Sequence, residues 1–435
     1  MKSIIKSLKG FNWRLWCALS VSLLIPALYS TIRINYLGNL PNEWGVNIAS
    51  QLAWVSLLFE IVEEAFLLPL FYVYGKSLVS KKELENKTKT TIILVGSIFL
   101  LLSLLICIFA KPLCIFMASD LATLNETIKY IRLESIGIVF SIVYKVLYVL
   151  LTTLESKRNI GILLITQTVL SILFDSLFFS NLPISLHFGV NGIAYTNIIV
   201  KITLIIITFV MLDKKDIKIL NSDNISFSWM KEYLKISLYS GLESFVRNIA
   251  YILMVSKMVN TISEQGTYWV ANNFIWTWLL LPATAMYDVI QKETAEDINN
   301  IKTKTKGYIA VSTLFSILWF ASIPLWKPFI HNVLNVNEYQ TVYNIVLIQS
   351  IFYIIYIYNC IFDGTIYGRG KTEYMLIESI FTNSLFYTTM FVLYKKGIWI
   401  PTLNSISLMF GVGMAIDLIP TLYCYKLLKK KLYLD

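Results

Sequence analysis

Residues 91–110 read TIILVGSIFLLLSLLICIFA, a run of 20 residues without a charged side chain. An α-helix rises about 1.5 Å per residue, so a run of this length crosses the roughly 30 Å hydrocarbon core of a bilayer. Over its 435 residues the chain is 56% hydrophobic and 15% charged, whereas soluble domains carry about 25% charged residues. The sequence therefore predicts an integral membrane protein built from helices.

Further apolar runs of similar length occur on both sides of this stretch. They predict an all-α integral membrane protein with twelve transmembrane helices. The predicted spans are 14–38, 48–74, 89–110, 124–154, 159–181, 188–212, 229–258, 266–288, 307–326, 336–366, 372–394 and 401–425.

Basic residues are concentrated in alternate loops, which predicts the orientation because cytoplasmic loops are enriched in Lys and Arg. Lys76, Lys81 and Lys82 follow the second span, and Lys426 to Lys431 lie in the tail. The opposite side carries Lys111, Lys327, Lys395 and Lys396. We expect both termini in the cytoplasm and a multi-pass protein of the cell (plasma) membrane, the inner membrane where a cell has two. The net charge of +10 is then explained by these loops, with no nucleic-acid partner expected.

Short sequence matches suggest an internal repeat. Leu67 to Pro69 in span 2 recurs as Leu280 to Pro282 in span 8, and Lys111-Pro112 recurs as Lys327-Pro328 at nearly the same offset. Such repeats are common in transporters. They predict two six-helix halves around a central cavity, residues 1–212 and 228–435, joined by a cytoplasmic linker at 213–227.

Span 2 carries three acids in one turn, Glu60, Glu63 and Glu64. Ionisable groups inside a membrane are costly and usually face a partner or a water-filled cavity. Three like charges at this spacing do not all ionise easily, so at least one is expected to hold a proton, as a proton-carrying site requires. The alternative is a structural ion pair with Lys145 of span 4 or with another buried base.

Other buried charges are also candidates. Glu243 and Arg247 of span 7 are four residues apart, which fits either a functional site or an ion pair within one helix. Arg33, Asp175 and Asn197 lie at similar depths in spans 1, 5 and 6 and are expected to line one polar site. Asp363 lies near a cytoplasmic turn, where a capping role and a transport role are both open.

Three stretches resemble those of a known family. Residues 171–179 read SILFDSLFF and residues 189–194 read GVNGIA, while 363–371 read DGTIYGRGK. They resemble motifs of the multidrug and toxic compound extrusion (MATE) family, within the wider flippase and exporter superfamily. The resemblance covers nearly the whole chain in architecture, and its motifs are short.

The resemblance implies a cation site for Na⁺ or H⁺ formed by an Asp of span 1, an Asp of span 5 and polar groups of spans 4 and 6. Asp175 matches the span 5 acid, and Thr196 or Asn197 falls near the span 6 position. Arg33 stands where the span 1 acid is expected, and a guanidinium cannot bind a cation. Some members use an acid of span 7, for which Glu243 is the candidate. Because Arg247 falls nearer that position, we expect the span 2 glutamates to carry the proton.

These observations predict a secondary active transporter that exports an amphipathic cationic or zwitterionic solute by antiport with H⁺ or Na⁺, with the two halves rocking between inward-open and outward-open states. The alternative is a flippase for an anionic lipid-linked precursor, which buried arginines would suit. No nucleophile–base pair, phosphate loop or histidine metal site is apparent in the sequence, so we expect no enzyme and no cofactor. The expected partners are a small-molecule substrate and the bilayer, and the chain is expected to act as a monomer.

Overall fold

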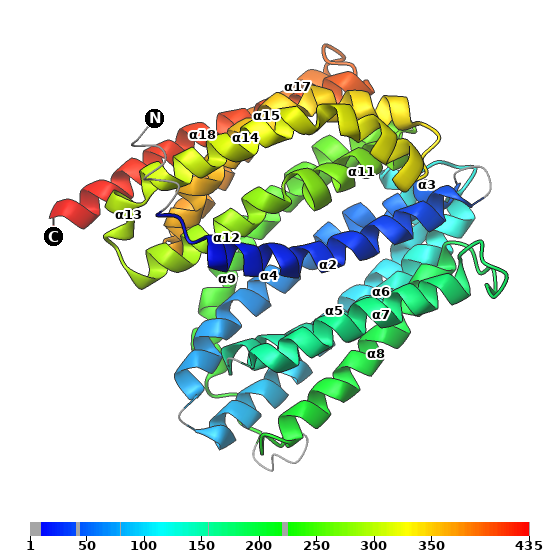
Figure 1. Cartoon of the computed structure of the whole chain (residues 1–435). Coiled ribbons are helices and arrows are strands. Elements are labelled where there is room, and N and C mark those ends of the chain that lie inside the picture. The colour runs from blue at the N-terminus through cyan, green and yellow to red at the C-terminus, as the bar shows by residue number, and fades with distance from the viewer. Residues whose placement is uncertain (1–9, 41–43, 79, 155, 220–224, 435) are drawn as a thin grey trace. The chain divides into compact units, whose positions relative to one another are not determined.

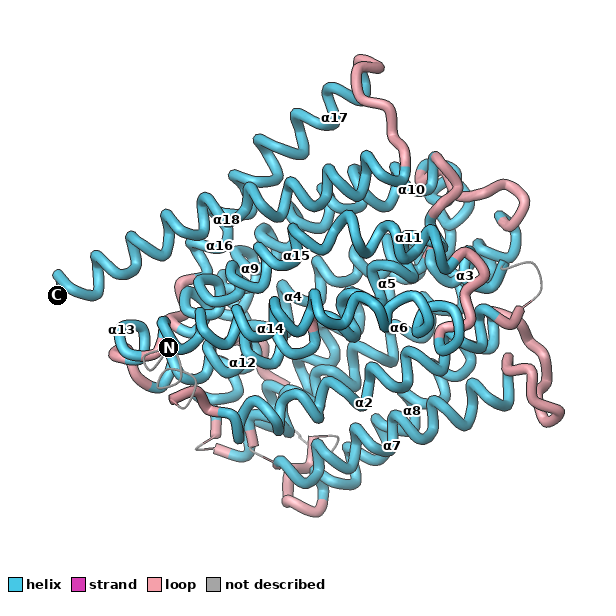
Figure 2. The backbone as a smooth tube through the Cα atoms, turned by 45° about the horizontal axis from the view of Figure 1, so that its top comes forward, coloured by secondary structure: helices cyan, strands magenta, loops and turns pink. Residues whose placement is uncertain are grey.

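The structure is a computed structural model that describes residues 10–40, 44–78, 80–154, 156–219 and 225–434. Within these residues the regular elements are all helices (Figure 2). The prediction of an all-α membrane protein is confirmed. Nine of the described helices are long and apolar enough to cross a membrane.

The chain forms two compact units. One comprises Tyr36–Ile252 and is called the 36–252 unit; the other joins Met1–Asn35 to Leu253–Asp435 and is called the two-segment unit. These units group the helices differently from the predicted halves, because the span 1 helix falls mainly in the two-segment unit and the span 7 helix in the 36–252 unit. The internal repeat itself stays a prediction.

The 36–252 unit contains seven described α-helices (Figure 1). They are α3 (Trp44–Ser50), α4 (Leu52–Ser77), α5 (Lys81–Phe116), α6 (Leu124–Thr153), α7 (Lys157–Phe178), α8 (Asn191–Asp213) and α9 (Met230–Tyr251).

The two-segment unit begins with most of α2 (Trp13–Gly38). Several of its later helices contain π-helical turns, which the sequence analysis did not predict. Its other elements are η2 (Ile252–Ser256, whose first residue belongs to the 36–252 unit), α10 (Lys257–Thr261), α11 (Gln265–Phe274), η3 (Ile275–Leu279), α12 (Leu281–Glu296), α13 (Asn300–Thr303), α14 (Thr305–Pro328), η4 (Phe329–Val333), α15 (Tyr339–Gly368), α16 (Thr372–Phe381), η5 (Thr382–Tyr387), α17 (Thr388–Lys395) and α18 (Leu403–Leu434).

Each predicted span coincides with one helix or with consecutive helices, so the count of twelve is consistent with the structure. Three of the predicted spans are absent from the nine that qualify by length and composition: α4, α9 and the α11–η3–α12 segment. The last is divided into short elements, whereas α4 contains Glu60, Glu63, Glu64 and Lys76.

Helix α6 lies at the middle of the 36–252 unit and packs against α4, α5 and α8. The core at this junction is aromatic and aliphatic: Phe59 of α4 stacks on Phe99 of α5 with ring centroids 5.6 Å apart. Leu147 and Leu150 of α6 are completely buried in the same core. This packing fixes the rotation of α4 and α6, and with it the direction of their charged side chains.

Helix α9 lies directly along α4. At Gly241 the backbones come so close that an added Cβ would stand 2.9 Å from the Cβ of Ala65. One residue earlier, the Ser240 hydroxyl donates to the Glu64 carbonyl at 2.9 Å. This close approach brings the side chains of α9 within reach of the glutamates of α4.

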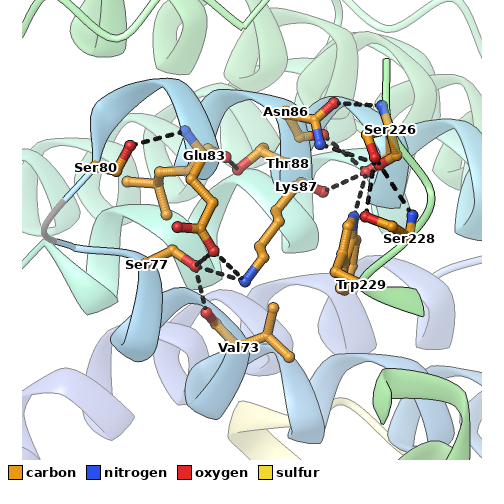
Figure 3. A network of polar contacts seen from close by, with 12 residues as sticks. Val73, Ser77, Ser80, Glu83, Asn86, Lys87, Thr88, Ser226, Ser228 and Trp229 are labelled. Atoms are coloured by element: carbon orange, nitrogen blue, oxygen red, sulfur yellow. Dashed lines mark hydrogen bonds and ion pairs between the residues drawn. The ribbon is translucent and has the colours of Figure 1, made fainter. Parts of the chain in front are cut away.

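The segment before α9 is bound to the start of α5 (Figure 3). Asn86 Nδ2 donates to the Ser226 carbonyl at 3.0 Å, and the Ser226 N–H donates back to Asn86 Oδ1 at 2.9 Å. Trp229 Nε1 donates to the Thr90 hydroxyl at 3.2 Å. The end of the predicted linker thus belongs structurally with the 36–252 unit, which explains why α9 does so too.

The start of α5 is itself well defined. Ser80 is the N-cap, and its hydroxyl accepts from the Glu83 N–H, which satisfies one of the free N–H groups of the first turn. Lys87 Nζ then lies 2.7 Å from Glu83 Oε1 and donates to the Ser77 hydroxyl at 2.8 Å (Figure 3). These contacts join the end of α4 to the start of α5 and anchor the helix that holds the segment before α9.

Candidate functional site

Three acids on α4 form the centre of the candidate site. Glu60 and Glu64 are four residues apart and share one helix face, and Glu63 lies beside it. Helix α9 packs along α4 on one side, and α6 also contacts α4. The three carboxylates contact two different cations, one on α9 and one on α6.

Arg247 of α9 is surrounded by three carboxylates. Its Nη2 donates to Glu64 Oε2 at 2.5 Å and lies 3.6 Å from Glu60 Oε1. Its Nε lies 3.3 Å from Glu243 Oε1 within the same helix. The ion pair expected within span 7 is therefore present, but it is one part of a larger cluster that links α9 to α4.

Lys145 of α6 holds the remaining glutamate. Its Nζ lies 2.6 Å from Glu63 Oε1 and 2.7 Å from Glu63 Oε2, so it contacts both oxygens. For Glu63, the structure has the pairing with Lys145 that the sequence analysis gave as an alternative. This pair links α4 to α6, while Arg247 links α4 to α9.

The cluster contains four carboxylates and two cations, so it is formally negative if every group is ionised. Glu60 has the longest carboxylate–cation distance within the cluster, 3.6 Å to Arg247 Nη2. Its side chain is 36% exposed, against 26% for Glu63, 26% for Glu64 and 16% for Glu243. Glu60 is therefore the acid that is least neutralised and most accessible, and it is best suited to exchange a proton or a cation.

Asn197 of α8 has a partner that the sequence analysis did not assign. Its Nδ2 donates to both oxygens of Glu134 on α6, at 2.9 Å and 3.0 Å. Glu134 is only 3% exposed. In the sequence, Glu134 is recognisable as an acid in the middle of an apolar span. Its partner can be identified only from the fold.

Asp175 lies near the end of α7 and is 1% exposed. The adjacent Ser176 hydroxyl is 2.9 Å from the Tyr36 hydroxyl. Arg33 lies on the part of α2 that belongs to the two-segment unit, with its guanidinium 4.7 Å from the centre of the Tyr29 ring. That Arg33, Asp175 and Asn197 line one site stays a prediction.

Asp363 lies inside the two-segment unit, on α15. Its Oδ2 accepts from Asn359 Nδ2 at 3.0 Å. On α18, Asp417 accepts from the Thr382 hydroxyl at 2.6 Å. Asp363 thus has a local hydrogen bond within its own helix, and its predicted part in transport stays a prediction.

Comparisons with known proteins agree on one architecture. A family model described as MatE matches residues 74–177. A solved structure described as the inward-facing conformation of a multidrug resistance MATE family transporter of the MOP superfamily is 16% identical, covers 93% of this chain and 95% of its own, and has a TM-score of 0.73. This chain has the fold of a MATE transporter. The resemblance predicted from the sequence is confirmed.

Two further solved structures extend the match. A MATE in complex with MaL6 is 16% identical over 99% of both chains, with a TM-score of 0.67. A MOP superfamily transporter from Pyrococcus furiosus, whose description reports reverse polarity of its binding pocket, is 17% identical over 97% of both chains, with a TM-score of 0.63. A search of curated protein sequences found no significant match.

The cluster on α4, α6 and α9 is the distinctive feature of this MATE-like chain relative to the pattern that the resemblance implied. The resemblance predicts that Arg33 stands in place of the span 1 acid and that Arg247 falls near the span 7 position where an acid is expected. The structure surrounds Arg247 with carboxylates and so returns negative charge to that region.

Proposed function

We propose that this protein is a secondary active membrane transporter that exports an amphipathic cationic or zwitterionic solute in exchange for protons. The observation that carries the proposal is the cluster in which four carboxylates surround two cations on neighbouring helices. Buried charges in membrane proteins commonly mark ion or proton pathways. The fold, shared with MATE structures, supports transport as the general class of activity.

Glu60 is the proposed proton carrier. In its ionised form it adds to the negative charge around Arg247; in its protonated form it removes one charge and weakens the attraction between α4 and α9. Proton binding and cation binding then compete for the same negative charge. A ligand that prefers one state of such an equilibrium shifts the protein toward that state, and this competition supplies the coupling of an antiporter.

The flippase alternative requires free positive charge to bind an anionic precursor. Lys145 and Arg247, the two cations of the cluster, each contact carboxylates at salt-bridge distance. The net charge of the cluster favours a cationic solute. The description of the Pyrococcus furiosus structure, however, reports a binding pocket of reverse polarity. The experiment below therefore includes the flippase as one of its outcomes.

The proposal is tested with purified protein in vesicles that contain a cationic dye. Dye efflux is followed under an imposed H⁺ gradient, an imposed Na⁺ gradient and no gradient, for the wild type and for Glu60→Gln, Glu64→Gln, Glu243→Gln and Asp175→Asn. We expect gradient-driven efflux by the wild type, a loss of roughly tenfold or more in Glu60→Gln, since general proton-transfer groups contribute factors of this size or larger, and retained efflux in Asp175→Asn.

Other outcomes of this assay are equally informative. Efflux that needs Asp175 and tolerates Glu60→Gln would place coupling at the site that the family resemblance implies. Efflux driven only by Na⁺ would replace the proton as coupling ion. Absence of dye movement under either gradient, together with binding of anionic lipid-linked precursors, would reject the exporter in favour of the flippase.

A further inference from the structure

A basic hollow lies between α5 and α6, away from the acid cluster. It has a volume of about 400 Å³ and is lined by Lys111, Asn125, Ile128, Lys129, Arg132 and Leu133. Three of these six residues are cations and none is acidic. The side chains of Lys111, Lys129 and Arg132 are exposed, so the hollow opens to the surroundings of the protein.

One hydrogen bond fixes the register of the two helices at this point. Arg132 Nε donates to the Cys107 carbonyl at 3.0 Å, which places residue 132 of α6 beside residue 107 of α5. The helices run in opposite directions, so Lys111, one turn beyond Cys107, lies level with the turn that contains Lys129. The donor in this bond is Nε. The two terminal nitrogens of Arg132, which can contact a phosphate or carboxylate, take no part in it.

These cations stand on the side of the membrane where the orientation prediction places few basic residues, the outer side. Lys129 and Arg132 lie five and eight residues after the first residue of α6, which corresponds to roughly 7 to 12 Å along the helix axis. That depth falls in the headgroup region and its border with the acyl chains. Positive charge there is costly unless an anion or water accompanies it.

The helix faces below the hollow are apolar and exposed. Leu104 and Ile108 precede Lys111 by seven and three residues and so share its face of α5, with exposures of 51% and 66%. Ile136 follows Arg132 by four residues on α6 and is 46% exposed. In a bilayer such a surface contacts acyl chains. A single amphipathic molecule with an anionic head and apolar tails matches both parts of this surface.

We propose that the α5–α6 hollow binds the phosphate of an anionic phospholipid from the predicted outer leaflet. Lys111, Lys129 and Arg132 contact the phosphate, Arg132 through its terminal nitrogens, and the acyl chains cover Leu104, Ile108 and Ile136. Charge-assisted contacts from Arg and Lys give phosphates their strongest protein partners. Basic pockets between transmembrane helices bind anionic headgroups on the cytoplasmic or matrix side of membranes, and the same chemistry applies to an anionic lipid of the outer leaflet. The site lies outside the proposed transport cluster and does not depend on which solute is exported.

The test uses full-length protein purified in detergent and stripped of lipid. Native mass spectrometry measures the binding of short-chain phosphatidylglycerol, phosphatidylcholine and inorganic phosphate. The variants are Lys111→Gln/Arg132→Gln and, separately, Lys129→Gln. Lys395→Gln/Lys396→Gln is the matched control, since it removes two lysines that are also predicted to lie on the outer side but belong to the other unit.

For the wild type we expect phosphatidylglycerol to bind roughly tenfold more tightly than phosphatidylcholine, as one or more charge-assisted hydrogen bonds predict. Lys111→Gln/Arg132→Gln should remove most of this preference, Lys129→Gln part of it, and the control none. Because their side chains are exposed, Lys129→Gln and the control are expected to keep the wild-type Tm, whereas Lys111→Gln/Arg132→Gln also removes the hydrogen bond from Arg132 to the Cys107 carbonyl and is expected to lower it slightly. Equal loss in the control, an unchanged preference in the hollow variants, or inorganic phosphate that binds as tightly as phosphatidylglycerol would overturn the proposal.

Discussion

Changing Lys145 to glutamate should destabilise the protein more than any other single change in the cluster. The new carboxylate would face Glu63, whose Oε1 now lies 2.6 Å from Lys145 Nζ, and α6 would repel α4 where it now attracts it. Breaking a buried ion pair costs about 3–5 kcal/mol; because the Lys145 side chain is 41% exposed, we expect about 2 kcal/mol from the lost pair, with the added repulsion on top. The measurement is the Tm of purified protein in detergent.

The exchange of the two residues provides the decisive control. Glu63→Lys/Lys145→Glu restores an ion pair with reversed polarity and should recover most of the lost stability. Lys306→Glu makes the same chemical change at an exposed position of α14 and should leave Tm nearly unchanged. If the exchanged double variant is no more stable than Lys145→Glu alone, the pair does not hold α4 to α6 as described.

Changing Arg247 to glutamine should impair both stability and transport. Glu64 would lose its charged donor, and three carboxylates would face one another without a cation between them. Removing a charged hydrogen-bond partner from a partly buried group costs about 1.5–3 kcal/mol. Dye efflux should fall together with the stability, since α9 would no longer respond to the charge on Glu60. The measurements are Tm in detergent and dye efflux from vesicles.

A second substitution separates the two effects. Arg247→Gln/Glu64→Gln removes the carboxylate left unpaired and should recover part of the stability without recovering gradient-driven efflux. Arg158→Gln, at an exposed position near the start of α7, serves as the control and should change neither property. Normal efflux by Arg247→Gln would show that the guanidinium has a structural role alone.

Hydropathy and charge pattern predicted most of this architecture. Even α4, with Glu60, Glu63 and Glu64, was predicted as a span because its remaining residues are strongly apolar. The π-helical turns such as η3 (Ile275–Leu279) were not predicted, since they depend on how side chains pack between helices and leave no periodic signal in the sequence.

The sequence predicted which residues form the candidate site, but it did not predict which of them contact one another across helices. Sequence spacing identified Glu243 and Arg247 as neighbours because they lie on one helix. It could not show that Arg247 also reaches Glu64, which is 183 residues away, because that contact depends on the close packing of α9 on α4 at Gly241. Glu134 was visible as a buried acid, yet its bond to Asn197 needed the fold.

In the proposed mechanism, Glu60 holds a proton that a cationic solute displaces. The most direct measurement is the pH of a weakly buffered solution of purified protein when a cationic dye is added, for the wild type and for Glu60→Gln. The wild type should release protons as the dye binds, and Glu60→Gln should bind dye with little or no release. Equal proton release by both proteins, or dye binding by the wild type without any release, would contradict the account.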